Sequence, residues 1–126
     1  MGFAKGELVL EVGYGPDCDD ELRTQIKGIV GTEFLEGATT DVVDAVLLWF
    51  REDDGDLVDE LMDALTYLTE TGPIWVLTPK LGRDGHVESS DIQDAAPIAG
   101  LSQTSTIALA QDWAGTRLVA RKVGKR

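Results

Sequence analysis

The sequence predicts an α/β domain with helices on both faces of a mostly parallel sheet and an antiparallel hairpin near its C-terminal end. Two apolar strands, expected over 45–50 and 74–78, flank an amphipathic helix at the spacing of a βαβ unit with parallel strands. A strand and a helix over 8–30 precede this unit. Two alternating segments, 104–110 and 117–121, follow it and are typical of a hairpin. Together these patterns indicate a three-layer sandwich.

The first strand is expected over 8–12, and the glycines and proline of 13–17 end it. Asp17 is predicted to cap the first helix, because a short polar side chain satisfies free N–H groups at a helix start. The apolar face of this helix is expected to consist of Leu22, Ile26 and Ile29. A short second strand is expected within 31–37, and one helical turn over 41–44.

The helix between the two apolar strands has the clearest pattern in the chain. Apolar residues recur at helical spacing at Leu57, Val58, Leu61, Met62, Leu65 and Leu68. Asp53 or Asp54 is expected to cap its start. The pair Gly72-Pro73 is expected to follow its end, because glycine tolerates the left-handed conformation and proline cannot continue a helix. A last helix is expected to begin at Ser89 or Ser90.

The predicted core combines the apolar strands with the inner faces of the helices and of the hairpin. Its members are Val9, Leu10, Val46, Leu47, Leu48, Trp49, Leu61, Leu65, Ile74, Val76, Leu77, Ile107 and Leu118. Trp75 lies in an apolar strand and is also expected to be buried. Trp113 falls in the predicted hairpin turn, 112–115. Either its ring folds back over the hairpin, or it is exposed and binds a partner, as exposed aromatic residues often do.

The length of 126 residues suits one domain, predicted over 1–121, with a basic tail at 122–126. No apolar run approaches the roughly 20 residues that cross a bilayer. The N-terminus has no apolar signal core, so we expect a cytoplasmic protein that does not contact membranes. Cys18 is the only cysteine and excludes an internal disulfide.

The charge is strongly asymmetric. Residues 1–116 hold all 23 acidic residues and six of the 11 basic ones, so this part carries a net charge of −17. Such a surface repels phosphate backbones, so we do not expect a nucleic-acid partner. These acidic residues either keep the protein soluble, or they bind a basic protein partner or a divalent cation.

The candidate ligand site lies where the parallel strands end, because such sheets bind ligands at the carboxyl ends of their strands. Its expected residues are Gly13, Gly15, Asp17, Arg51, Asp53, Thr78, Lys80, Arg83 and His86. The segment 78–86 is expected to line the main surface cleft. Lys80 and Arg83 would hold an anion, and His86 could exchange protons near its reference pKa of about 6.5. Alternatively, Lys80 or Arg83 pairs internally with Asp84, Asp53 or the acidic helix.

No catalytic residue and no metal ligand is assigned. A nucleophile at motif spacing, such as Gly-x-Ser-x-Gly, is missing from the sequence, and Cys18 has no identifiable base. The acidic loop 51–56 could offer carboxylates to a hard cation such as Mg²⁺. Equally, these carboxylates favour the positive end of the helix that follows.

Two resemblances extend these predictions. The segments 44–56, 78–86 and 112–122 resemble a family of short acidic bacterial proteins, common in actinobacteria, that is classed as a domain of unknown function. The outline of the chain also resembles a reduced, Rossmann-like methyltransferase domain that depends on S-adenosylmethionine. In this second resemblance, Glu11 to Asp17 is similar to the glycine-rich cofactor loop, and Glu36 stands where that family's ribose-binding acid follows the second strand.

The second resemblance has two departures. Asp17 replaces the third glycine of the loop, so a carboxylate stands where the carboxylate of the cofactor would approach. The strand and helix that would form the adenine wall are contracted. We therefore predict a non-catalytic binding or regulatory module with a protein partner and no cofactor. The alternative is a small enzyme or sensor that binds a nucleotide-like or S-adenosylmethionine-type ligand through Gly13–Asp17.

Overall fold

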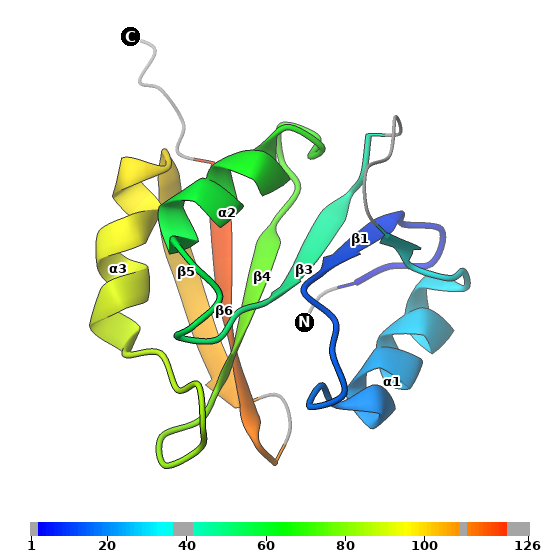
Figure 1. Ribbon diagram of the computed structural model, residues 1–126. Helices are drawn as coiled ribbons and strands as arrows, with labels where there is room; N and C mark the ends of the chain where they lie inside the picture. The colour runs from blue at the N-terminus through cyan, green and yellow to red at the C-terminus, as the bar shows by residue number, and fades with distance from the viewer. Residues whose placement is uncertain (1–2, 37–41, 109–110, 121–126) are drawn as a thin grey trace, which may run out of the picture.

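The computed structural model describes residues 3–36, 42–108 and 111–120, except for the side chain of Ala108. A six-stranded sheet forms its centre, with the strand order β2-β1-β3-β4-β6-β5 (Figure 1). The strands are β1 (Val9–Val12), β2 (Leu35–Glu36), β3 (Ala45–Trp49), β4 (Ile74–Pro79), β5 (Leu101–Ala108) and β6 (Trp113–Ala120). The first four are parallel, and β6 lies antiparallel between β4 and β5. The predicted α/β sandwich with an antiparallel C-terminal hairpin is confirmed.

Helices cover both faces of the sheet. On one face lies α1 (Asp20–Val30), and on the other lie α2 (Leu57–Leu65) and α3 (Ser89–Ile98) (Figure 1). Every residue of β3 and β4 is buried, as expected for central parallel strands covered on both sides. Successive residues of β3 enter opposite cores: Val46 packs in the cluster with α2 and α3, and Leu47 in the cluster with α1.

The helix boundaries differ from the predicted ones. Asp19, and not Asp17, caps α1, because its carboxylate accepts from the N–H of Leu22 at 2.9 Å. Likewise Asp56 caps α2, in place of the predicted Asp53 or Asp54. The buried faces of α1 and α2 also differ slightly from the predicted ones. The exposed fractions of Ile29 and Met62 are 50% and 52%, while Val30 and Ala64 are buried in their place.

The crossover helix α2 ends at Leu65, well before Gly72. The backbone beyond it pairs with Val43, whose N–H donates to the carbonyl of Tyr67 at 2.7 Å and whose carbonyl accepts from Thr69 at 3.0 Å. Leu68 forms an isolated parallel bridge with Val43. Tertiary pairing next to β3 therefore replaces the last helical turn.

The hairpin is longer than predicted on both sides. Its first strand begins at Leu101, and β6 begins at Trp113, so the predicted turn at 112–115 is wrong. Each residue from Trp113 to Leu118 faces a partner on β4, which explains why this segment is extended. Ile107 is exposed and does not belong to the core. In the predicted turn 41–44, Asp41 lies outside the described residues, and the rest of the segment is not helical.

Candidate functional site

Arg51, two residues beyond β3, joins the carboxyl ends of β1 and β3. Its Nη2 and Nε donate to the two carboxylate oxygens of Asp17 at 2.6 and 3.0 Å, and its Nη1 donates to the carbonyl of Gly13 at 2.7 Å. Gly13 has a φ of +83°, and a Cβ there would collide with the carbonyl oxygen of Trp49. A Cβ at Gly15 would stand 3.3 Å from Nη2. The structure thus brings four predicted site residues together.

The guanidinium of Arg51 is saturated with partners. Asp54 accepts from its backbone N–H at 2.9 Å and from Nη1 at 3.2 Å, and Nη2 lies 3.2 Å from Sγ of Cys18. The hydrogen bonds with Asp17 raise the pKa of Arg51 and lower the pKa of the Asp17 carboxyl. Burial raises the pKa of the Cys18 thiol, which makes it a poor nucleophile. This cluster therefore closes the loop after β1.

The segment 78–86 packs against Arg51. A Cβ at Gly85 would lie 2.9 Å from Cβ of Arg51, and the carbonyl of Gly85 accepts from the N–H of Glu52 at 2.9 Å. Thr78 is buried within β4, and Lys80 is half-buried just beyond it. The segment is thus close to Arg51, as predicted. A separate hollow of about 440 Å³ is lined by Gly13, Gly15, Asp17 and Arg51, but by no residue of this segment.

Two residues of this segment, Arg83 and His86, have internal partners. Arg83 forms an ion pair with Asp112, with Nη1 and Oδ2 3.1 Å apart. The ring of His86 lies between the carbonyl oxygen of Pro79, 2.9 Å from Nδ1, and the carboxylate of Glu88, 3.4 Å from Nε2. Of the two alternatives for Arg83, internal pairing is therefore the one observed, although the partner differs from those predicted.

A cleft of about 540 Å³ opens where β1 and β2 end, against the C-terminal part of α2 and the turn after it. We refer to it as the β1–β2 cleft. Its lining residues are Leu10, Glu11, Val12, Gly13, Tyr14, Glu36, Glu60, Asp63, Ala64, Thr66 and Tyr67. Of the predicted ligand-binding residues, only Gly13 lines it. The prediction that 78–86 lines the main cleft is wrong, because that segment folds onto Arg51 instead.

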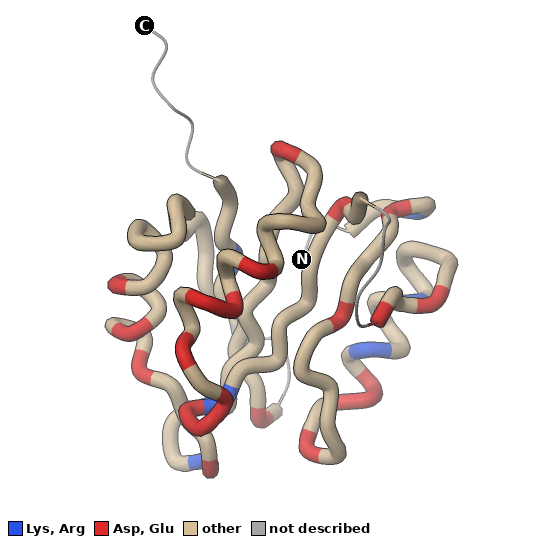
Figure 2. The backbone as a smooth tube through the Cα atoms, turned by 45° about the horizontal axis from the view of Figure 1, so that its top comes forward, with Lys and Arg blue, Asp and Glu red and all other residues tan. Residues whose placement is uncertain are grey.

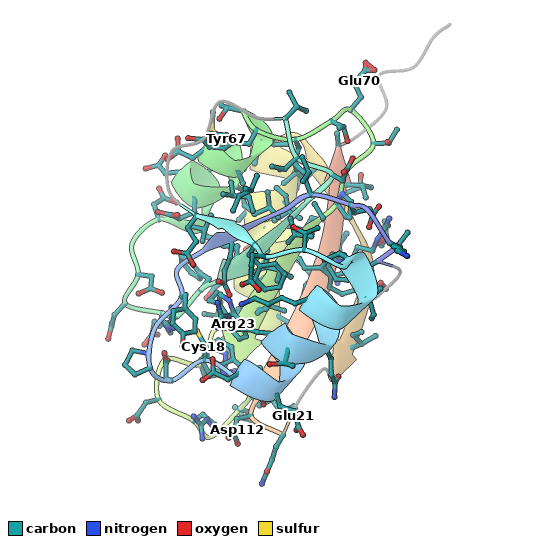
Figure 3. The ribbon with its side chains drawn as sticks, turned by 90° about the vertical axis from the view of Figure 1, so that its right-hand side faces the viewer. Cys18, Glu21, Arg23, Tyr67, Glu70 and Asp112 are labelled. Carbon is teal, nitrogen blue, oxygen red and sulfur yellow. The ribbon has the colours of Figure 1, made fainter. Side chains whose placement is uncertain are left out.

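Glu11 anchors the floor of the β1–β2 cleft. Its side chain is fully buried, and Arg23 of α1 binds it through Nε and Nη2 at 2.6 and 2.7 Å (Figure 3). The indole N–H of Trp49 donates to the same carboxylate at 2.9 Å. The guanidinium of Arg23 also stacks on the ring of Tyr14, 3.9 Å from its centroid. The charge of Glu11 is thus balanced by that of Arg23, and these bonds hold this part of the cleft wall in position.

Three other carboxylates face the β1–β2 cleft from its rim: Glu36, Glu60 and Asp63. Within the described ranges, none of them forms an ion pair. Burial raises the pKa of Glu60, and the nearby Asp63 raises it further. No Lys or Arg occurs between Glu52 and Pro79, and Figure 2 shows how acidic residues dominate this part of the backbone. The cleft therefore favours neutral or cationic ligands over phosphates.

Sequence reasoning missed Tyr14, Glu60 and Tyr67 as cleft residues. A signal existed for part of this wall, since Glu60, Asp63, Ala64 and Tyr67 have the i, i+3, i+4, i+7 spacing of one helical face. The apolar stripe of the same helix concealed it. Tyr67 follows α2 (Figure 3), and this half-buried residue lines the cleft.

Trp113 and Asp53 lie outside the cleft. The Trp113 ring is 2% exposed and meets Trp49 edge to face, with centroids 4.8 Å apart. Its N–H donates to the carbonyl of Asp17 at 3.2 Å. The ring is therefore buried, so the exposed partner anchor is wrong, but it packs on β3 and on the loop after β1 and not back over the hairpin. Asp53 is exposed in the loop before α2. The described side chains form no cluster of three His, Cys, Asp or Glu residues suited to a metal.

None of the described helices combines the length and apolar composition required to cross a membrane.

Solved methyltransferase structures share the fold. A putative methyltransferase from Thermoplasma acidophilum superposes with a TM-score of 0.68 at 10% identity, over 95% of this chain and 70% of that one. A SAM-dependent methyltransferase from Aquifex aeolicus gives a TM-score of 0.57 at 14% identity, over 93% of this chain and 84% of that one. An O-methyltransferase of neocarzinostatin biosynthesis, solved with S-adenosylmethionine, gives a TM-score of 0.62 at 16% identity, over 92% of this chain and 49% of that one.

Sequence relatives identify the family. Uncharacterised proteins of Mycobacterium tuberculosis and Mycobacterium bovis are 48% identical over 128 aligned residues, which cover 100% of this chain and 80% of each relative. The family described as "Protein of unknown function (DUF3052)" matches residues 1–122. The chain therefore belongs to the DUF3052 family of proteins of unknown function, with the Rossmann-like fold of methyltransferases.

Proposed function

We propose that this protein is a non-catalytic module that binds a nucleoside-like ligand in the β1–β2 cleft. One observation carries the proposal. The cleft joins Gly13 and Glu36 at the ends of two neighbouring strands, whereas Asp17, in the same loop, is paired with Arg51. The cleft beside Glu36 is thus open, whereas the adjoining hollow of about 440 Å³ has the Asp17–Arg51 ion pair in its lining.

The lining of the β1–β2 cleft suits a nucleoside better than a nucleotide. Its volume of about 540 Å³ falls within the range of about 300–1,000 Å³ that is common for small-molecule sites. Tyr14 and Tyr67 offer aromatic surface to a base, and Glu36 offers charged acceptors to ribose hydroxyls. Glu60 and Asp63 add negative charge that repels a phosphate.

The chemistry of the described residues supports binding without reaction. The thiol of Cys18 and the imidazole of His86 do not line the β1–β2 cleft. Arg51 is occupied by Asp17 and Asp54 and offers no free charge to a substrate. A module that binds without reacting acts through a partner, and the acidic surface over α2 and α3 favours a basic protein surface.

Titration with adenosine tests the proposal. Adenosine at a hundred times its Kd should raise the free energy of unfolding by about 2.7 kcal/mol, which thermal-shift measurements detect. Glu36→Gln should weaken binding about tenfold or more, because a charged acceptor to a hydroxyl contributes about 1.5–3 kcal/mol. Glu70→Gln, an exposed site beyond α2 (Figure 3), is the matched control. If adenosine does not bind, or if both variants bind it equally, the site lies elsewhere.

The second candidate is an enzyme that uses S-adenosylmethionine, which the fold and the placement of Gly13 and Glu36 favour. We expect this cofactor to bind weakly or not at all, since the resemblance implies that its carboxylate would approach Asp17, whose own carboxylate is paired with Arg51. Calorimetry that gives a micromolar or tighter Kd would place the enzyme first. Adenosine binding without S-adenosylmethionine binding would favour the module.

A further inference from the structure

We propose a second binding site, for a small zwitterion such as a free α-amino acid, at the edge of the sheet opposite the β1–β2 cleft. A cavity of about 230 Å³ opens there, where β3 and β4 begin. We refer to it as the amino-edge cavity. Glu7, Asp44, Trp75 and Arg117 line it, together with the hydroxyl-bearing Thr69 and Thr71.

An unsatisfied donor lies in the wall of the amino-edge cavity. Trp75 is 2% exposed, and its indole N–H has no hydrogen-bond partner in the described part of the chain. The other two indoles are bonded, Trp49 to Glu11 and Trp113 to the carbonyl of Asp17. A buried donor left without a partner destabilises the fold, so its retention requires an explanation. The nitrogen itself is buried, so an acceptor on a ligand in this cavity would meet it only after a small movement of the ring.

Arg117 stands beside this donor. It is the partner of Trp75 across the β4–β6 pairing, so both side chains project from the same face of the sheet. Its Nη1 donates to Oγ1 of Thr104 at 3.1 Å, and no ion pair involves it among residues 3–36, 42–108 and 111–120. A guanidinium that lines a cavity and has no described ion pair is a suitable receptor for a carboxylate.

Charge of the opposite sign lines the same cavity. Glu7 and Asp44 each accept one backbone hydrogen bond at 2.9 Å, through Oε1 and Oδ2. Neither carboxylate pairs with a described cation, although Arg117 lines the same space. An ammonium group would satisfy them. Two carboxylates against one guanidinium disfavour a simple anion, which is why the site suits a zwitterion.

The size of the cavity limits the ligand. The volume of about 230 Å³ is below the roughly 300–1,000 Å³ of drug-sized sites, so the ligand is a small metabolite and not a nucleoside. The amino-edge cavity and the β1–β2 cleft share no lining residue, so the two sites can be tested independently.

Three probes with nearly the same skeleton separate the charge requirements: L-alanine, propionate without the ammonium, and ethylammonium without the carboxylate. The indole N–H resonances of the ¹⁵N-labelled protein report binding, and Trp75→Phe assigns the resonance of Trp75. We expect L-alanine alone to shift that resonance in a saturable way, while the bonded indoles of Trp49 and Trp113 do not move. No saturable shift with L-alanine, or an equal shift with propionate, would overturn the proposal.

Arg117→Met tests the carboxylate receptor. We expect it to weaken L-alanine binding at least tenfold, and the unchanged Trp49 and Trp113 resonances would show that the fold is intact. Arg83→Met is the matched control, because Arg83 is paired with Asp112 outside the amino-edge cavity. Equal affinity of the Arg117→Met and wild-type proteins would contradict the assignment of the receptor.

Discussion

Replacing Arg23 by alanine should lower the free energy of unfolding by about 3–5 kcal/mol, because it leaves a buried carboxylate without its cation. The side chain of Glu11 is 0% exposed and that of Arg23 is 13% exposed, so water cannot replace the lost partner. Two hydrogen bonds, at 2.6 and 2.7 Å, disappear together. Only the indole N–H of Trp49 still donates to the carboxylate.

Urea denaturation followed by tryptophan fluorescence measures this loss. With an m-value of about 2 kcal/mol/M, the midpoint should fall by roughly 1.5–2.5 M. Lys27→Ala is the matched control on the same helix, because Lys27 pairs at 3.0 Å with Glu33, whose side chain is 85% exposed. An exposed pair contributes at most about 1 kcal/mol, so this variant should change the midpoint little.

Arg23→Ala losing no more than Lys27→Ala would refute the reasoning from burial. A double variant, Arg23→Ala with Glu11→Gln, separates charge from packing. The neutral amide no longer needs a cation, so the double variant should be more stable than Arg23→Ala alone. If it is no more stable, the unpaired charge is not the main cost, and the lost stacking of Arg23 on Tyr14 explains the loss better than the ion pair does.

Three further predictions concern other parts of the structure. Leu61→Ala should cost about 2–5 kcal/mol in chemical denaturation, because the residue is fully buried, while Met62→Ala, 52% exposed, should cost less than about 1 kcal/mol. Gly13→Ala should lower the thermal midpoint, because the left-handed conformation alone costs about 1–2 kcal/mol and the new Cβ meets a carbonyl oxygen. The folded-state pKa of Asp17 is lowered by Arg51, so this pair stabilises the fold above the unfolded value of 3.8 and stops doing so as the pH falls through the lowered pKa. Asp17 is about half exposed, so the pair contributes at most about 1 kcal/mol. Thermal unfolding at a series of pH values should show that Arg51→Met lacks this acid-dependent part of the stability.

Each of these predictions has a contrary result. Equal denaturation midpoints for Leu61→Ala and Met62→Ala would mean that the stripe of α2 is not buried as described. An unchanged melting temperature in Gly13→Ala would mean that the loop after β1 can move away from β3. If wild type and Arg51→Met lose stability in parallel below pH 4, other carboxylates, and not Asp17, control the acid response.

The sheet and its helices could be predicted because their signals are local and periodic. The apolar strands around 46 and 76 and the stripe of α2 each required only neighbouring residues. The errors arose where distant backbone decided the outcome. Val43 draws the chain after Leu65 into pairing, and β4 holds Trp113 in an extended strand although its local sequence is typical of a turn.

The candidate site was predicted only in part, for a related reason. The prediction that Gly13, Asp17 and Arg51 lie at the same edge of the sheet follows from the parallel strands, and it was correct. Whether such groups leave a cleft or fill it depends on side-chain partners that are far apart in the sequence. Arg51 was expected near a ligand, and it instead binds Asp17, 34 residues away.

The insertion of β6 between β4 and β5 has a consequence for synthesis on the ribosome. Until β6 has emerged, one side of β4 has no strand to pair with, although all six of its residues are buried in the finished protein. An apolar strand with an unpaired edge is prone to associate with other chains. The nascent domain is therefore most vulnerable late in translation, and a chaperone that shields this edge would have to release it as the last strand arrives.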